Sequence, residues 1–112
     1  GTGNPRREFL HVHDLATACF HLLSLDSPPD WVNVGVGDDV TIRELASLVA
    51  RTVGFTGEIL TDPSRPDGTP RKLMDISRIK ATGWSPEMPL EAGLANAYRD
   101  FLSTLALGAA RL

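Results

Sequence analysis

The sequence predicts a small domain of the α/β or α+β class. Short apolar runs typical of strands alternate with longer segments in which apolar residues recur every three or four positions, as on the buried face of a helix. The chain has 112 residues, and 42% of them are hydrophobic, which is enough for one modest core. We therefore expect residues 1–112 to form a single domain with three main helices and three or four short strands.

The first half of the chain opens with a turn-rich stretch, after which residues 8–12 are predicted to form a strand. Asp14 is a natural N-cap, and the apolar spacing that follows it predicts a helix over residues 14–25. Cys19 lies in the apolar run of this helix, so we expect a buried thiol; as the only cysteine, it excludes an internal disulfide. Residues 31–35 are almost entirely apolar, the pattern of a strand covered on both faces.

In the second half, one helix has clear signals at both ends. Thr41 and Glu44 have the spacing of a capping box, and Gly54 stands where a C-terminal glycine belongs, so a helix is predicted over residues 42–53. The other predicted elements are a strand at residues 59–61, an extended segment at 73–76, a short turn over 77–81 capped by Ser77, and a last helix with Pro89 in its first turn.

The overall charge and hydropathy argue against several classes of partner. The chain has 11 Lys and Arg against 14 Asp and Glu, a net charge of -3, so its surface as a whole does not attract nucleic acid. No apolar run approaches the roughly 20 residues of a membrane span, and no basic segment followed by an apolar one suggests export. We therefore expect a cytoplasmic protein with no nucleic-acid or membrane partner.

Three histidines raise the question of a metal site. His11 and His13 would share one face of an extended segment, and His21 lies two helical turns further along the chain. Neither a second cysteine nor a convergent pair of carboxylates completes a set of ligands. We therefore predict that the chain holds no metal, and that the imidazoles pack locally or face water.

The loop at residues 65–72, RPDGTPRK, is both rigid and strongly charged. Its prolines restrict φ, and Gly68 can adopt whatever the turn requires. Such a loop can present its cations, together with Arg6 and Arg7, to phosphate oxygens with little loss of entropy on binding. Residue chemistry alone leaves two interpretations open: a clamp for a diphosphate, or a solvated loop whose cations pair with Asp67.

The stretch GVGDD at residues 35–39 contains a G-x-G sequence, which raises the question of a dinucleotide site. The third glycine of the dinucleotide fingerprint is absent, and the acidic residues that follow would repel a pyrophosphate. We therefore interpret this stretch as a turn before a helix.

Several segments together resemble one known group of enzymes. They are GTGNPRREFLHVHDLA (1–16), VNVGVGDDVTIRELA (32–46), GEILTDPSRPDGTPRKLMDISRI (57–79), GW (83–84) and LEAGL (90–94). Through them, nearly the whole chain resembles the C-terminal part of the GDP-L-fucose synthases, which belong to the extended short-chain dehydrogenase/reductase family. REFLHV and NVG are common to many extended members, whereas PDGTPRKLMD is more specific to the synthases. His13 departs from the pattern, because an acid usually stands there, and we expect only a local change at the start of the helix.

The resemblance implies that this part of the enzyme recognises a nucleotide sugar. Arg7, which precedes EF, and Lys72, which ends PDGTPRK, are implied to contact the diphosphate of a GDP-sugar, and Asp67 is implied to border the substrate. Arg71 and Asn33 are weaker candidates, since structural hydrogen bonding would explain each equally well. The synthases convert GDP-4-keto-6-deoxymannose to GDP-L-fucose by 3,5-epimerisation and NADPH-dependent 4-reduction.

The catalytic and cofactor motifs of the family are absent from these residues. No glycine-rich nucleotide loop is present, and Tyr98 is followed by Leu102 where a Tyr-x-x-x-Lys pair needs lysine. The resemblance therefore implies that NADP and the catalytic residues belong to an N-terminal Rossmann portion, and that this chain alone binds no cofactor and is inactive. Residues 14–35 would pack on that portion, and without it we expect them to repack or to form a homodimer.

Two other interpretations stay open at this point. The chain could belong to another nucleotide-sugar epimerase or dehydratase of the same family, which a preference for UDP- or dTDP-sugars over GDP-sugars would indicate. It could instead be a non-catalytic module for nucleotide binding or oligomerisation, which would bind GDP tightly and form a defined oligomer by itself.

Overall fold

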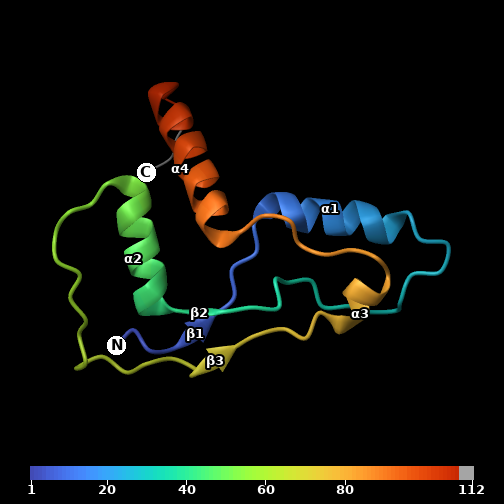
Figure 1. The fold of residues 1–112 in the computed structure, drawn as a ribbon, viewed down its shortest axis with the longest axis horizontal. Helices are drawn as coiled ribbons and strands as arrows, with labels where there is room; N and C mark the ends of the chain where they lie inside the picture. Colours follow the sequence, from blue (N-terminus) through green and yellow to red (C-terminus); the bar gives the residue numbers. More distant parts are fainter. Residues whose placement is uncertain (109–112) are drawn as a thin grey trace.

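A computed structural model describes residues 1–108 as three two-residue strands and four helices (Figure 1). Their order is β1 (Arg6–Arg7), α1 (Val12–Leu23), β2 (Val40–Thr41), α2 (Ile42–Val53), β3 (Arg71–Lys72), α3 (Ser77–Ala81) and α4 (Leu90–Ala106). The predicted mixture of helices and short strands is confirmed. Among these residues, no helix is long and apolar enough to cross a membrane.

The three strands form one small sheet in the order β2-β1-β3. The central strand β1 is antiparallel to β2 and parallel to β3. A further hydrogen bond from the Arg6 amide to the Pro70 carbonyl, 2.8 Å long, holds the loop before β3 against β1. In Figure 1 the sheet lies at the base of α2, which begins directly after β2. The sheet thus brings together three segments that lie far apart in the sequence.

The apolar strands predicted at residues 8–12, 31–35 and 59–61 were wrong, because none of these segments pairs in a ladder within residues 1–108. A strand is stable only where a neighbour accepts and donates its backbone hydrogen bonds. Val32 and Val34 nevertheless pack against the core, so their apolar character reflects burial rather than sheet pairing. The sheet forms instead at residues rich in arginine and lysine, which an apolar pattern does not mark.

The first helix begins earlier than predicted, at Val12. His11 is its N-cap, and the ring Nδ1 of His11 accepts a hydrogen bond from the His13 amide, 3.2 Å long. Asp14 is therefore not the cap. It is almost fully buried in the first turn, and its carboxylate accepts hydrogen bonds from the amides of Glu87 and Met88, at 3.2 and 3.0 Å. Asp14 thus ties the segment that precedes α4 to the start of α1.

The boundaries of α2 are confirmed at both ends. The Thr41 hydroxyl accepts from the Glu44 amide at 3.0 Å, and the Glu44 carboxylate accepts from the Thr41 amide at 2.7 Å, which completes the capping box. Gly54 ends the helix in the left-handed conformation with φ 74, which costs glycine little. Pro89 immediately precedes α4 as its N-cap, so the start of that helix is confirmed to within one residue.

The core is small and lies between α1 and α3. Its buried side chains are Ala18, Ile76, Ile79 and Trp84, with Leu10, Leu22, Val32 and Val34 packed around them. The indole N–H of Trp84 donates to the Thr17 hydroxyl at 3.1 Å, which satisfies the polar atom of an otherwise buried ring. This core fixes the positions of α1, α3 and the segment that leads from β3 to α3.

The opposite face of α1 is uncovered within the described residues. Phe20 and Leu23 are 76% and 83% exposed, and Cys19 is also exposed, so the prediction of a buried thiol was wrong. The helical spacing identified the apolar side chains correctly, but only Ala18 and Leu22 face the core. The apolar stripe of α1 is wider than the surface that this chain offers to cover it.

Candidate anion-binding site

The sheet sorts four cations, two from β1 and two from β3, into two pairs. In the parallel register of β1 and β3, Arg6 lies opposite Arg71, and Arg7 lies opposite Lys72. Residues directly opposite each other in neighbouring strands project to the same face, and successive residues project to opposite faces. Arg6 and Arg71 therefore share one face of the sheet, and Arg7 and Lys72 share the other.

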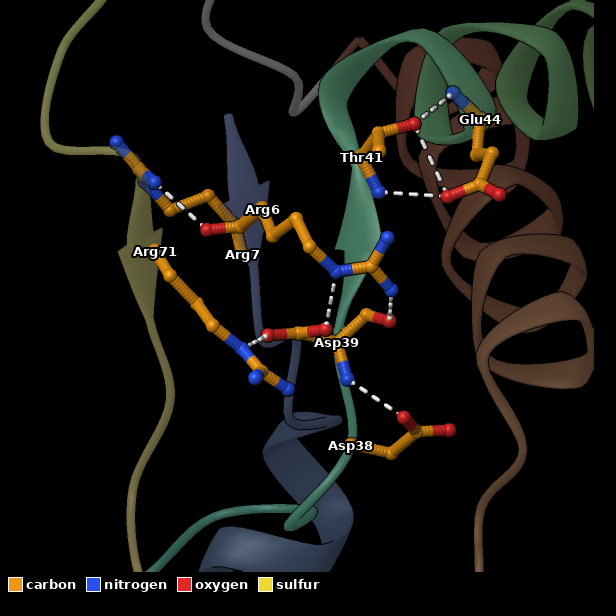
Figure 2. A network of polar contacts seen from close by, with 7 residues as sticks. All are labelled: Arg6, Arg7, Asp38, Asp39, Thr41, Glu44 and Arg71. Carbon is orange, nitrogen blue, oxygen red and sulfur yellow. Dashed lines mark hydrogen bonds and ion pairs between the residues drawn. The ribbon is translucent and has the colours of Figure 1, made fainter. Parts of the chain in front are cut away.

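Asp39 binds both cations of the first pair. Nε of Arg6 lies 2.7 Å from Oδ1 of Asp39, and Nε of Arg71 lies 2.5 Å from Oδ2, so each carboxylate oxygen binds one guanidinium group (Figure 2). Nη2 of Arg6 also donates to the Asp39 carbonyl at 2.8 Å. The Asp39 side chain is only 1% exposed. These two arginines therefore stabilise the fold. For Arg71, the sequence left open a contact with the substrate or structural hydrogen bonding, and the structure shows the second.

The second pair is available to a ligand. Arg7 and Lys72 both line an open cavity of 390 Å³ whose walls include Leu10, Val34 and Met74. Figure 2 shows the guanidinium group of Arg7 pointing away from Asp39, where it donates to the Arg6 carbonyl at 2.6 Å. No ion pair involves Arg7 or Lys72 within residues 1–108. The two predicted diphosphate contacts therefore lie on one side of the molecule and in one cavity.

Asp67 lies in a second cavity, of 440 Å³, which Arg7 also lines. Its carboxylate accepts hydrogen bonds from the Thr2 hydroxyl at 2.6 Å and from the Thr2 amide at 2.7 Å, and these bonds hold the pKa of Asp67 below its usual range. A side chain at residue 68 would crowd Arg7, because a Cβ on Gly68 would lie 3.3 Å from Nη2 of Arg7. Asp67 thus anchors the rigid loop to the start of the chain, and Gly68 allows the loop to approach the guanidinium group.

Sequence reasoning missed two carboxylates that organise this region. One is Asp39, whose arginine partners lie 33 and 32 residues away. The other is Glu8, which accepts from the amides of Val36 at 3.2 Å and Met74 at 3.3 Å and so joins two segments that form no ladder. The partners of both carboxylates lie far away in the sequence, so no pattern of neighbouring residues predicts these contacts.

The remaining candidates make structural contacts. Nδ2 of Asn33 donates to the Asp75 carbonyl at 3.2 Å. Nε2 of His21 lies 2.9 Å from the Thr82 hydroxyl, and this hydroxyl donates to the Ile79 carbonyl, so the imidazole is the donor to Thr82. Within residues 1–108, no three His, Cys, Asp or Glu side chains gather in a way that suits a metal ion.

Comparison with known proteins shows which enzymes this chain is similar to. No protein-family model matches the chain. The chain is 52% identical over 105 residues to the probable GDP-L-fucose synthase 1 of Oryza sativa, which covers 94% of the chain and 32% of that protein. It is 49% identical over 111 residues to the GDP-L-fucose synthase of Escherichia coli, which covers 91% of the chain and 35% of that protein.

Solved structures agree with the sequence relatives. A GDP-6-OMe-4-keto-L-xylo-heptose reductase from C. jejuni superimposes with a TM-score of 0.83 at 34% identity, over 93% of this chain and 33% of the reductase. A GDP-mannoheptose C4 reductase from Campylobacter jejuni, solved with NADP bound, gives 0.75 at 37% identity, over 88% of this chain and 32% of the reductase. The chain belongs to the extended short-chain dehydrogenases/reductases. It corresponds to their C-terminal portion and spans about a third of the length of the curated relatives it matches.

The GVGDD stretch at residues 35–39 of this extended dehydrogenase/reductase chain does not have the geometry of a dinucleotide-binding loop. In the GVGDD stretch, Gly37 has φ 76 and makes a turn, and the Asp38 carboxylate accepts from the Asp39 amide at 2.8 Å. Asp39 then holds two arginines, and β2 and α2 follow directly. The stretch is thus a turn that precedes a helix, as predicted, and its two carboxylates would repel a pyrophosphate.

The Asp39 ion pairs predict that this chain loses stability in acid. The hydrogen bond from Arg71 and, after it, the one from Arg6 hold the pKa of the Asp39 carboxyl below the value of about 3.9 that it has in an unfolded chain. A carboxyl whose pKa is lower in the folded state stabilises the fold above its unfolded pKa, and this contribution disappears as the pH falls through the folded value. The loss therefore begins below about pH 4.

Urea unfolding at pH 7 and pH 3 measures this effect. The wild-type chain is expected to lose more free energy of unfolding between these two values than an Asp39→Asn variant, which has no carboxyl to protonate at this position. Asp67 and Glu44, whose pKa values are also lowered, remain in both proteins and cancel in the comparison. Equal losses in the two proteins would contradict the role assigned to Asp39.

Proposed function

We propose that this chain is the nucleotide-sugar-binding portion of an enzyme of the GDP-L-fucose synthase type, and that Arg7 and Lys72 hold the diphosphate of a GDP-sugar. One observation carries the proposal. Arg7 and Lys72 are in register on adjacent strands and line the same cavity, while Asp39 binds the cations on the other face. The high identity to named synthases supports the choice of a GDP-sugar.

The chemistry of the pair suits a diphosphate. The planar guanidinium of Arg7 can donate two parallel hydrogen bonds to phosphate oxygens, and the ammonium of Lys72 supplies a compact second charge. Glu8 lines the same cavity, but its oxygens accept from the amides of Val36 and Met74. The site therefore has a net excess of donors on the side where the two phosphates would lie. Asp67, beside Arg7 in the neighbouring cavity, would border the nucleotide.

In the whole enzyme, the proposed reaction is the conversion of GDP-4-keto-6-deoxymannose to GDP-L-fucose by epimerisation at two carbons and reduction of the ketone. NADPH would supply the hydride, and the related structure with NADP bound supports this cofactor. We assign the cofactor and the acid-base residues to an N-terminal Rossmann portion, because this chain has no Tyr-x-x-x-Lys pair and the G-x-G of its GVGDD stretch is a closed turn. The chain by itself is then inactive, and the whole enzyme is cytoplasmic.

The uncovered face of α1 also supports the presence of an N-terminal portion in the whole enzyme. Val12, Phe20 and Leu23 are at least 72% exposed, and Trp31 is 64% exposed in the segment that follows. Side chains of this kind are each stabilised by roughly 1.5–3 kcal/mol when fully buried. We propose that the N-terminal portion covers residues 14–35, and that without it two copies of the chain associate through this face. Sedimentation that shows a monomer at high concentration would contradict the homodimer.

Isothermal titration of the 112-residue chain with GDP, GMP, UDP and guanosine tests the proposal. GDP is expected to bind at least about tenfold more tightly than GMP, since the second phosphate adds a charge-assisted contact. Guanosine, which has no phosphate, is expected to bind most weakly of the guanine compounds. Equal affinity for UDP and GDP would favour another nucleotide-sugar epimerase or dehydratase, and equal affinity for GDP and guanosine would overturn the clamp.

A further inference from the structure

Asp39 joins all three strands at one point. It directly precedes β2, and its carboxylate binds Arg6 from β1 and Arg71 from β3 (Figure 2). Its carbonyl accepts a further bond from Arg6 at 2.8 Å, and its own amide is held by the Asp38 carboxylate at 2.8 Å. The backbone of Asp39 is thus held by its neighbour Asp38, and the Asp39 carboxylate in turn holds one residue on each of the other two strands.

The strands need such a contact, because each has only two residues. Short strands make few ladder hydrogen bonds, and a slip of one residue moves every side chain to the opposite face of a sheet. In this sheet, a slip of β3 by one residue would separate Lys72 from Arg7 and place Arg71 beside Arg7 instead. The two ion pairs of Asp39 oppose this slip, since they hold Arg6 and Arg71 opposite each other.

We propose that Asp39 is a positioning residue for the anion site: by binding Arg6 and Arg71 on one face of the sheet, it keeps Arg7 and Lys72 together on the other. This role rests on the proposed function, because it concerns the same diphosphate clamp. Asp39 lines neither of the cavities that hold Arg7 with Lys72 or with Asp67, although it and Arg7 both line a third cavity, of 260 Å³. The Asp39 carboxylate itself is held by Arg6 and Arg71, so we assign its effect on the ligand to these arginines.

The sign of one substitution separates positioning from simple electrostatics. Asp39→Asn removes a negative charge near the proposed phosphate site, so a purely electrostatic effect would tighten the binding of an anion. Loss of positioning would instead weaken it, because the register of β1 and β3 would no longer be held. We expect the Kd of the folded variant for GDP to rise about tenfold or more, with little change for guanosine.

The titration is made at a temperature where circular dichroism shows that the variant is folded, so that lower stability does not lower the measured affinity. In Asp39→Asn, the guanidinium groups of Arg6 and Arg71 lose their partner and could bind GDP themselves. The triple variant Asp39→Asn with Arg7→Ala and Lys72→Ala measures this binding alone, and it is subtracted from the GDP binding of Asp39→Asn. Unchanged or tighter binding of GDP by folded Asp39→Asn would overturn the positioning role.

Asp39→Glu provides the second variant, since it keeps the charge but moves the carboxylate by one methylene group. We expect it to bind GDP about threefold more weakly than the wild type, between the wild type and Asp39→Asn. If Asp39→Asn does not fold, unchanged affinity in Asp39→Glu overturns the proposal. If the unsubstituted chain binds GDP and guanosine equally well, both the clamp and the positioning role are refuted. If Arg7→Ala weakens GDP binding and Asp39→Asn does not, the positioning role alone is refuted.

Discussion

Replacing Arg7 and Lys72 together with alanine is expected to weaken the binding of GDP to this chain by about 100-fold or more. A hydrogen bond to a charged group contributes about 1.5–3 kcal/mol, and the variant removes one such donor group from each of two adjacent strands. Guanosine has no phosphate to lose, so its affinity should change little. Isothermal titration with both ligands measures the difference.

A matched variant separates the site from the overall charge. Lys80→Ala with Arg99→Ala also removes one lysine and one arginine, both exposed and on helices outside the two cavities. This control should bind GDP as the wild type does, to within about twofold. If both double variants lost the same affinity, the effect would come from the net charge of the chain, and the Arg7–Lys72 clamp would be rejected.

The second large effect is expected in the core, where Ile79→Ala should lower the free energy of unfolding by about 2–5 kcal/mol. Ile79 is 0% exposed, and it is the largest fully buried apolar side chain in a core of only four buried hydrophobic residues. The surrounding side chains cannot fill the space that it leaves, because the core has few members. Since small domains have little stability to lose, the variant should be partly unfolded at 37 °C.

Urea unfolding, followed by the fluorescence of the buried Trp84, measures this loss. Leu107→Ala is the control: it removes an apolar side chain of the same size that is 83% exposed and lies outside α1, and it should change the free energy of unfolding by no more than about 0.5 kcal/mol. The assignment of the core to the contact between α1 and α3 would be refuted if Ile79→Ala were as stable as the wild type.

Local signals predicted the helices well. The capping box of Thr41 and Glu44 and the terminal Gly54 lie within one helix and its ends, so their geometry depends on neighbours in the sequence. The start of α1 was displaced by two residues because Asp14 makes a contact with residues 87 and 88, more than 70 positions away, instead of capping its own helix. A cap is local, but the choice between capping and a distant partner is not.

The strands and the buried surfaces could not be predicted in the same way. The apolar runs at residues 8–12, 31–35 and 59–61 have the composition of strands but no ladder partner within residues 1–108, whereas the cationic pairs in β1 and β3 do pair. Likewise, helical spacing identified the apolar side chains of α1 but not which of them the core covers, and Cys19 is exposed. Both properties depend on what lies alongside an element, and no single segment contains that information.

By itself, the sequence determined the class of fold, the ends of α2, and, through the resemblance of PDGTPRKLMD and REFLHV to the synthases, the identity of Arg7, Asp67 and Lys72 as candidates. Only the tertiary structure decided which cations are bound within the protein and which remain for a ligand. The physical reason is the alternation of side chains along a strand: adjacent arginines point to opposite faces, and a carboxylate more than 30 residues away binds the arginines of one face alone.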